Sequence, residues 1–409
     1  MAPLKVLICG GGISGPALAF WLSKLGHDIT VLDLRGPGIP VMKRMGLEQL
    51  FRSQTVSEAG MELVNDSGKR MAFFPVNKSG EGLQSFTTDF EIMRGDLCRM
   101  LYSVTEDCVK YIFGVHLQSF EQDDDSVRVK FSNGKEGQYD LLVGADGQGS
   151  RTRKMTLGPN VSNPFHSLDL FIAYFTVPRE KGDEYMSTLY NAPGRRFVFT
   201  RRHASDTIQA YLGYCNASDE LEKVGKRDIA DQKRTPRIIR DMQNDATAND
   251  FYSQEVGQVK LDSWSRGRVV LVGDAAYCPS PATGMGTTSG LVGAYVLAGE
   301  IGKYFSPSES SNGVESPLST ALKAYDSRFR PFMDQVQTLG PGMPGSAIPE
   351  TKWGIHLMHL ILWLSALLGI DAVARWFLRE KTVWDLPNYI ELDFSIEDRS
   401  DDVSAKKTL

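Results

Sequence analysis

A glycine-rich turn near the start of the chain constrains the fold more than any other sequence feature. Gly10, Gly12 and Gly15 fit the pattern G-x-G-x-x-G, between the apolar run Leu4–Cys9 and apolar residues at helical spacing. The first glycine permits a tight turn, the second lets a pyrophosphate approach the backbone, and the third lets the helix pack closely on the strand. The helix that opens near Ser14 offers free N–H groups to phosphate oxygens. We therefore expect a dinucleotide-binding βαβ unit, for FAD or NAD, with a tight structural turn as the alternative.

The second strand of this unit ends in an acidic residue. Ile29–Leu32 is apolar and β-branched, and Asp33 follows it about twenty residues after the glycines. A carboxylate at that place accepts a hydrogen bond from a ribose hydroxyl in dinucleotide-binding folds. Asp33 is therefore a candidate ligand of the nucleotide ribose.

Two further glycine motifs each follow a buried strand. Asp146 and Gly147 come after an apolar run, where they could hold a polar ligand at a sheet edge or form a plain strand-to-loop turn. Asp274 follows Gly273 at the end of the apolar strand 268–272. The glycine turn 284–286 then aims the N-terminus of the next helix into the same cleft, where the helix dipole favours a negative group.

Charge and cysteine usage exclude several classes of function. The chain holds 45 Lys and Arg against 50 Asp and Glu, so no basic surplus is available for a nucleic acid partner. The five cysteines are far apart, odd in number and without a C-x-x-C pair, which argues against a disulfide framework and against a zinc site. We expect a cytoplasmic protein without a metal ion.

One apolar segment, Trp353–Ile370, leaves two structures open. It runs for eighteen residues without Asp, Glu, Lys or Arg, which is the lower limit for a membrane-spanning helix. A helix packed between two domains can also be apolar nearly all round, and histidines and glycines interrupt this one. We expect a helix between domains, with membrane association as the alternative.

Outside the motifs, the sequence predicts a second, strand-rich region. Aromatic strand patterns cover 171–177, 196–200 and 207–214, and they are followed by a charged helical stretch, 219–244. Further expectations are a hairpin over 61–75, a helix over 95–105, strands over 110–120, 127–131 and 139–143, a helix over 287–304, and a surface loop over 306–319.

Taken together, the three motifs resemble those of the FAD-dependent monooxygenases of the p-hydroxybenzoate hydroxylase type, the class A flavoprotein monooxygenases. After G-x-G-x-x-G come D-G-x-x-S-x-x-R at 146–153 and G-D with a following proline at 273–281. Within that group, the stretches 33–38, 44–47 and 92–97 are most similar to the tetracycline-inactivating monooxygenases and their bacterial and fungal relatives.

The resemblance implies an FAD site and assigns residues to it. Asp33 would bind the adenosine ribose, Arg94 the FAD phosphates and Asp274 the ribityl chain, while Asp146 and Gly147 belong to a motif implicated in both FAD and NAD(P)H binding. No catalytic protein side chain is implied, because the flavin carries the chemistry. The cofactor-binding residues that we expect are Gly10, Gly12, Ser14, Gly15, Asp33, Arg35, Arg94, Asp146, Gly147, Gly273, Asp274, Pro281, Gly284, Met285, Gly286 and Thr287.

The chain departs from the family around Asp33. In relatives, the acid that ends the second strand and the D-L-R-G stretch are separate, whereas 31–36 merges them here. Either Asp33 binds the ribose in place of the usual glutamate, or this chain has lost the longer connection that separates the two features in relatives. We favour loss, because 33–38 matches the downstream stretch better.

The resemblance also implies an α/β (α+β) fold, in which a Rossmann-like FAD-binding domain is interleaved with a β-sheet substrate domain and a C-terminal helix bridges the two. The FAD-binding domain would comprise 1–60, 94–163 and 255–340, the substrate domain 61–93 and 164–254, and the helix and tail 341–409.

The implied reaction is the hydroxylation or epoxidation of a small aromatic or polyketide-like metabolite, in secondary metabolism or xenobiotic modification. NAD(P)H would visit transiently to reduce FAD, and O2 would be captured as a C4a-hydroperoxyflavin. This agrees with the single dinucleotide fingerprint, because prolines interrupt the glycine-rich stretch 340–345. The substrate walls would come from Phe171, Tyr174, Phe175, Phe197, Phe199, Tyr211 and Tyr214.

Two alternatives to this function remain. One is another flavoprotein oxidoreductase of the same fold, and the other is a relative impaired in FAD binding by the shortened segment near Asp33.

Overall fold

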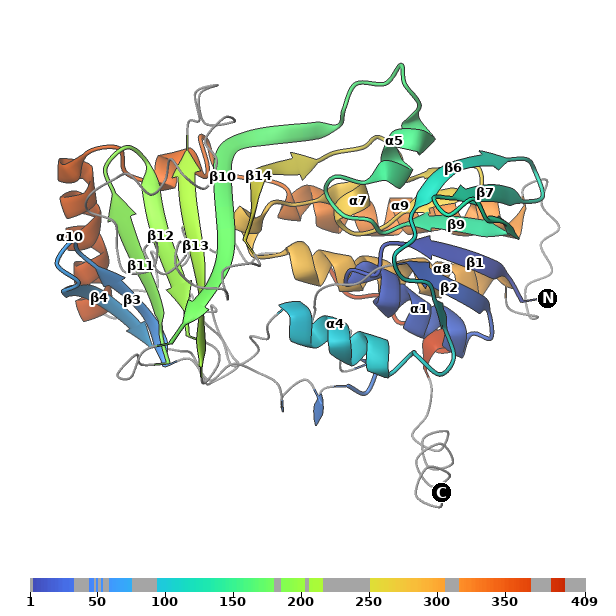
Figure 1. Cartoon of the computed structure of the whole chain (residues 1–409), viewed down its shortest axis with the longest axis horizontal. Coiled ribbons are helices and arrows are strands. Elements are labelled where there is room, and N and C mark those ends of the chain that lie inside the picture. The colour runs from blue at the N-terminus through green and yellow to red at the C-terminus, as the bar shows by residue number, and fades with distance from the viewer. Residues whose placement is uncertain are drawn as a thin grey trace.

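Two sheet-based domains lie side by side in the protein (Figure 1). The computed structural model describes residues 3–32, 44–47, 49–50, 53, 59–75, 94–179, 185–202, 206–215, 251–305, 316–368 and 384–393. Asp33, Arg35 and the expected helical stretch 219–244 lie outside these residues.

The first domain is built on a six-stranded sheet in the order β15-β16-β9-β1-β2-β5. β1 is parallel to both β2 and β9, and β9 is parallel to β16, so a βαβ unit opens the chain as predicted. The strands are β1 (Lys5–Cys9), β2 (Asp28–Leu32), β5 (Lys110–Tyr111), β9 (Leu141–Gly144), β15 (Ser265–Arg266) and β16 (Val269–Leu271).

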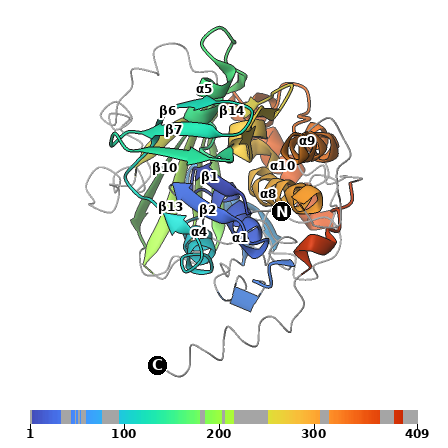
Figure 2. The same cartoon turned by 90° about the vertical axis from the view of Figure 1, so that its right-hand side faces the viewer.

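Both faces of this sheet are covered, which explains why its central strands read as continuous apolar runs. Alternate residues of β1 enter different cores: Val6 and Ile8 pack on the helical side, and Leu7 packs on the other. The helical side holds α1 (Ser14–Lys24), α8 (Gly286–Phe305) and α9 (Pro317–Val336), and the other side holds a small sheet of β6 (Leu117–Gln122), β7 (Val127–Phe131) and β8 (Glu136–Tyr139). Figure 2 shows these two layers on either side of β1 and β2.

Three expected boundaries differ from the structure. The run 110–120 is not one strand but β5 and β6, in different sheets, with Gly114 at φ +72° between them. The run 139–143 is likewise divided between β8 and β9, and the break lies at Asp140, whose carboxylate accepts a hydrogen bond from the Lys5 N–H at 2.6 Å. The loop over 306–319 ends earlier than expected, because Ser316 caps α9 by accepting a hydrogen bond from the Ser319 N–H.

The second domain is a seven-stranded sheet in the order β14-β10-β13-β12-β11-β3-β4. Its hairpin β3–β4 turns where the sequence predicts, at Asn65, whose side chain accepts hydrogen bonds from the N–H groups of Ser67 and Lys69. The strands are β3 (Gly60–Val64), β4 (Arg70–Pro75), β10 (Phe165–Pro178), β11 (Ser187–Ala192), β12 (Arg196–Arg201), β13 (Thr207–Cys215) and β14 (Tyr252–Val259). The long strand β10 reaches from one domain into the other (Figure 1).

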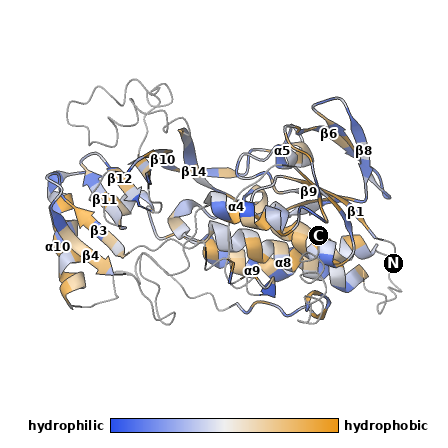
Figure 3. Cartoon of the chain, turned by 60° about the horizontal axis from the view of Figure 1, so that its bottom comes forward, coloured by the Kyte–Doolittle hydropathy of each residue, from blue (hydrophilic) through white to orange (hydrophobic). Residues whose placement is uncertain are grey.

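The C-terminal segment contacts both domains, and the described part of its helix lies on the second one. α10 (Lys352–Leu368) packs against β4 and β11, and β3 and β4 are coloured hydrophobic in Figure 3. The tail 384–393 instead returns to the first domain, where the Tyr389 hydroxyl donates to the buried Glu300 carboxylate at 2.6 Å. Among the residues that the structure describes, no helix has the length and apolar character needed to cross a membrane.

Gly299→Ala should dislodge this tail. A Cβ at position 299 would lie 2.2 Å from the Tyr389 ring, which cannot move without breaking its contact with Glu300. We expect the free energy of unfolding to fall by about 1–3 kcal/mol, as overpacking does elsewhere, measured by chemical denaturation.

The matched control is Gly95→Ala in α4 (Arg94–Ser103), where the added Cβ would meet only the flexible end of Arg99 at 3.5 Å. This variant should lose no stability. If the losses in free energy of unfolding caused by Tyr389→Ala and Gly299→Ala simply add in the double variant, the two positions are not coupled. The proposed contact between position 299 and the Tyr389 ring would then be wrong.

Candidate cofactor site

The three glycine motifs meet at one edge of the six-stranded sheet. Gly10 follows β1, Asp146 follows β9, and Asp274 follows β16. These strands are parallel neighbours, so their carboxyl ends lie together, where open α/β sheets bind their ligands. The structure therefore brings together residues that are more than 260 positions apart in the sequence.

The first motif is held so tightly that two of its positions admit only glycine. Gly10 has φ +109°, and a Cβ there would lie 2.2 Å from the Ala145 carbonyl oxygen. A Cβ at Gly15 would lie 1.9 Å from the Gly10 carbonyl oxygen. Gly12, half-buried in the same turn, lies two residues before the start of the helix.

The N-terminus of α1 suits the phosphates of a dinucleotide. Its N-cap residue, Ile13, makes no side-chain capping bond, and the first turn of the helix, which is fully described, holds no acidic residue. The free N–H groups and the positive end of the helix dipole therefore remain for an anion. The backbone packing and this open helix end both fit FAD.

Ser14 connects the first motif to the third. Its side chain is buried, and a Cβ at Gly273 would lie 2.2 Å from its hydroxyl oxygen. The same hydroxyl would be 2.8 Å from a Cβ at Gly290, in the second turn of α8. Gly273 also needs a glycine for its φ of +67°. The start of α1, the end of β16 and α8 are thus in direct contact.

Asp146 uses its carboxylate within the second motif. One oxygen accepts a hydrogen bond from the Ser150 hydroxyl, and the other accepts from the N–H and hydroxyl groups of Thr152 at 2.9 and 3.0 Å. Asp146 thereby orders the turn that contains Gly147 and leads into α5 (Arg151–Leu157). This is the strand-to-loop structure left open above, and contact of Asp146 or Gly147 with a cofactor stays a prediction.

Arg153 ties the second motif to the third. Its guanidinium is 1% exposed and donates hydrogen bonds to the Gln148 carbonyl oxygen at 2.5 Å and the Ala275 carbonyl oxygen at 2.9 Å. Burial lowers the pKa of this guanidinium, and the neighbouring Asp146 opposes that shift. The last residue of D-G-x-x-S-x-x-R is therefore a structural link between two loops.

The segment after Asp274 brings the start of α8 to the site. Asp274 opens the short helix α7 (Asp274–Tyr277) and is half-buried, and burial together with Asp274 raises the pKa of the Cys278 thiol. Pro281 then begins a single 3-10 turn, and Gly284 takes φ +66°. α8 begins at Gly286, next to the half-buried Met285 and Thr287, and its first turn is likewise free of acidic residues.

Two buried glutamines that the sequence motifs do not include hold this segment in place. The Gln337 side-chain amide donates to the carbonyl oxygens of Val259, Tyr277 and Cys278 at 2.7–3.1 Å. Gln258 donates to the Pro279 carbonyl oxygen at 3.1 Å. An isolated glutamine carries no spacing pattern, so only the fold reveals these two.

The remaining expected ligands are described incompletely. Arg94 is the first residue of α4, which packs on α1, and its side chain lies outside the described part of the chain. Asp33 and Arg35 also lie outside it. Their roles toward the cofactor stay predictions.

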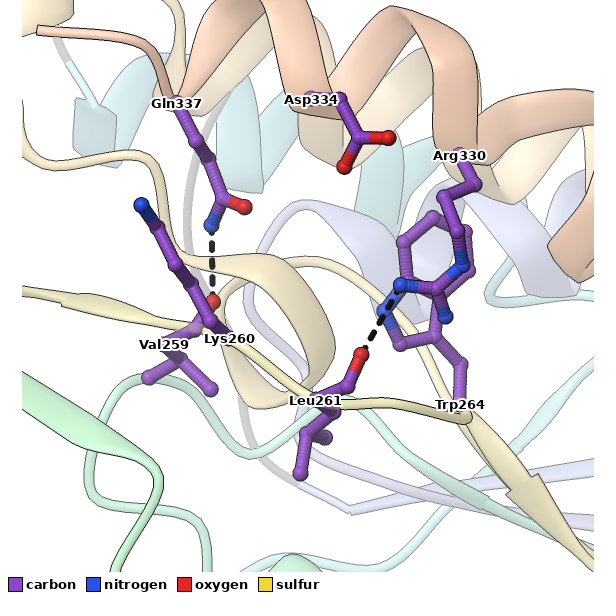
Figure 4. Close-up of a pocket in the computed structure, with 7 residues that line it drawn as sticks. All are labelled: Val259, Lys260, Leu261, Trp264, Arg330, Asp334 and Gln337. Carbon is purple, nitrogen blue, oxygen red and sulfur yellow. Dashed lines mark hydrogen bonds between the residues drawn. The ribbon is translucent and has the colours of Figure 1, made fainter.

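A small cavity lies behind the site, between the end of β14 and α9 (Figure 4). It has a volume of about 130 Å³, whereas pockets for organic ligands span roughly 300–1,000 Å³. Its lining residues are Val259, Lys260, Leu261, Trp264, Arg330, Asp334 and Gln337. It is therefore too small for FAD or for an organic substrate.

The expected aromatic walls do not share one face of the second sheet. Tyr174 pairs with Tyr211, and Tyr211 pairs with Phe199, so these three lie on one face, with Phe197. Phe171, Phe175 and Tyr214 lie on the other, because side chains alternate along a strand. Gln258, at the end of β14, lies on the same face as Tyr174. Gln254 pairs with Ile172, which is two residues from Tyr174 and so shares its face, and every second residue of β14 from 254 to 258 points to that face. Only that first face therefore continues toward the loop that Gln258 holds.

Arg153→Met tests the link between the second and third motifs. The substitution keeps most of the side-chain volume but leaves two carbonyl oxygens, at Gln148 and Ala275, without their donor. We expect the free energy of unfolding to fall by about 1–3 kcal/mol, measured by urea denaturation. Arg151→Met, at an exposed position two residues away, is the control and should change it by less than about 0.5 kcal/mol. Equal effects at the two positions would contradict the assigned link.

Comparison with known proteins identifies the family of the chain. A family model described as "FAD binding domain" matches residues 3–336. The chain is 42% identical to the FAD-dependent monooxygenase asL4 of Sarocladium schorii, over 96% of this chain and 99% of the relative. It is 37% identical to the flavin-dependent monooxygenase eupH of a Phoma species, over 90% of this chain and 93% of the relative.

Solved structures give the same result. The crystal structure of the tetracycline destructase Tet(55) superposes with a TM-score of 0.72 at 26% identity, covering 95% of this chain and 99% of that one. The expected resemblance, fold class and cofactor are therefore confirmed. The chain belongs to the FAD-binding-domain family and is an FAD-dependent monooxygenase.

Proposed function

We propose that the protein uses NAD(P)H and O2 to insert one oxygen atom into a small aromatic or polyketide-like metabolite, by hydroxylation or epoxidation, in secondary metabolism. The observation that carries this proposal is the meeting of three glycine motifs with the open N-termini of α1 and α8 at one sheet edge. Bound FAD supplies the redox chemistry, by accepting electrons from NAD(P)H and reacting with O2.

The residues of the chain would bind and orient the cofactor. The turn 10–15 and the first N–H groups of α1 would hold the pyrophosphate, and Asp274 the ribityl chain. The start of α8, at Gly286 and Thr287, would lie beside the ring, where the helix dipole favours the negative charge of a reduced flavin. Among the described residues one dinucleotide-binding turn is present, and NAD(P)H would bind transiently without such a turn of its own.

The substrate would lie against the aromatic face of the second sheet that carries Tyr174 and Tyr211. These rings contact each other at 5.2 Å between centroids, and both are half-buried, as are Phe197 and Phe199 on the same face. Half-buried aromatic rings offer flat apolar surface to a planar molecule. Gln258 on this face holds the loop that leads to α8, which would place the substrate between the sheet and the cofactor.

The reaction can be tested with a panel of phenols and polyketides. The FAD-loaded protein should oxidise NADPH or NADH, consume O2 and add one oxygen atom to at least one compound, as followed by absorbance, an oxygen electrode and mass spectrometry. NAD(P)H oxidation without O2 uptake would indicate a different flavoprotein oxidoreductase. A protein that binds no FAD would indicate the impaired relative.

Tyr174→Ala should separate substrate binding from cofactor binding. Loss of the ring opens the proposed substrate wall, so we expect less product and more hydrogen peroxide per NAD(P)H oxidised. FAD affinity should not change, because Tyr174 lies in the second sheet. Phe171→Ala, on the opposite face of the same strand, is the matched control and should leave the product yield near that of the unmodified protein. The same loss of product yield in both variants would contradict the proposal that the substrate binds the face with Tyr174.

A further inference from the structure

Helix α10 is apolar on two opposite sides, and in the described part of the chain other elements pack against one of them. Its inner side is buried against the second sheet through Leu362, which packs with Met61 and Leu63 of β3. Its outer side faces solvent at the end of the molecule farthest from the six-stranded sheet (Figure 1). The exposed fractions there are 73% for Trp353, 40% for Leu357, 51% for Leu360, 48% for Ile361, 47% for Trp363, 41% for Leu364 and 66% for Leu367.

Five of these residues follow the spacing of a helix-pairing seam. Trp353, Leu357, Leu360, Leu364 and Leu367 are separated by four, three, four and three positions. This is the a/d repeat with which one helix inserts its side chains between those of another. Isolated apolar residues on a surface are common, whereas a continuous heptad seam of them is typical of a helix that has a partner.

The exposed area is also close to that of an interface. Seven large apolar side chains, each 40–73% exposed, present a patch of several hundred Å². The largest apolar patches of monomers reach roughly 300–600 Å², and each partner of a standard-size complex buries about 800 Å². Part of the flanking surface would bring the buried area of this face to that value.

We propose that α10 pairs with α10 of a second copy of this chain, antiparallel about a two-fold axis. Reversing the seam places a positions opposite d positions, so Leu357 meets Leu367 of the partner subunit and Leu360 meets Leu364 of the partner subunit. Each contact occurs twice, as symmetry requires of such an interface. Four leucine layers then close along the seam.

The charges of the helix favour a second copy over a lipid surface. α10 contains no Asp or Glu, so pairing brings no acidic side chains of the two copies together along the seam. Helices that bind membrane surfaces are rich in Lys and Arg, whereas Lys352 is the one such residue within Lys352–Leu368.

The mass of the FAD-loaded full chain in detergent-free buffer tests the proposal. Light scattering after gel filtration should give twice the 45.3 kDa of the chain. Leu360→Glu with Leu364→Glu places like charges opposite each other, so this variant should run as a monomer with an unchanged flavin spectrum. Phe113→Glu, at an exposed apolar residue elsewhere, is the control and should remain a dimer.

A disulfide experiment tests the register without relying on that variant. In a Cys108→Ser background, Leu357→Cys combined with Leu367→Cys should form a covalent dimer on oxidation, and Leu357→Cys alone should not. Cross-linking by the single variant would mean a parallel pair and overturn the proposal. A monomeric wild-type protein would also overturn it, whether or not the protein pellets with phosphatidylcholine and phosphatidylserine vesicles.

Discussion

The cofactor site depends on a backbone approach that a single methyl group would prevent. Gly10 at the end of β1 lies so close to Ala145 at the end of β9 that the two loops cannot separate without breaking the central pair of the sheet. Ser14 of the first motif lies against Gly273 of the third, and Arg153 of the second motif donates hydrogen bonds to the carbonyl oxygens of Gln148 and Ala275. Each motif is therefore in contact with the other two, so the protein itself orders this part of the site.

This arrangement gives the motif residues two different tasks. Gly10, Gly15, Asp146 and Arg153 make contacts with the protein itself, and those contacts explain why the chain has these residue types there. By contrast, the N–H groups of Ser14 and Gly15 in α1, and of 286–288 in α8, precede the first hydrogen bond of their helix, which joins Ala17 to Ile13 in α1 and Ser289 to Met285 in α8. The motif residues thus hold the loops together, while the N-termini of α1 and α8 provide the positive partial charge that suits the phosphates of a dinucleotide.

Much of the fold could be predicted because turns, hairpins and helix starts are determined by residues close together in the sequence. The turn 10–15, the hairpin at Asn65 and the helix after Gly286 each follow from residues within a few positions. Long-range choices could not be read in the same way. No residue near Asp140 indicates that β8 and β9 belong to different sheets, and Gln258 and Gln337 act through backbone carbonyl oxygens 21 to 79 positions away in the sequence. The aromatic walls needed the pairing register, which alone assigns Tyr174 and Phe171 to opposite faces.

The sheet order of the first domain also bears on how the chain is made. β1 leaves the ribosome first, but its neighbour β9 begins 132 residues after Cys9, and β16, which pairs with β9, follows only at Val269–Leu271. At roughly 5–20 residues per second, β1 would wait on the order of 7 to 26 s for β9. Throughout that time an apolar strand would have an unpaired edge. Synthesis of this enzyme should therefore depend on chaperones that shield β1 until the middle of the chain arrives.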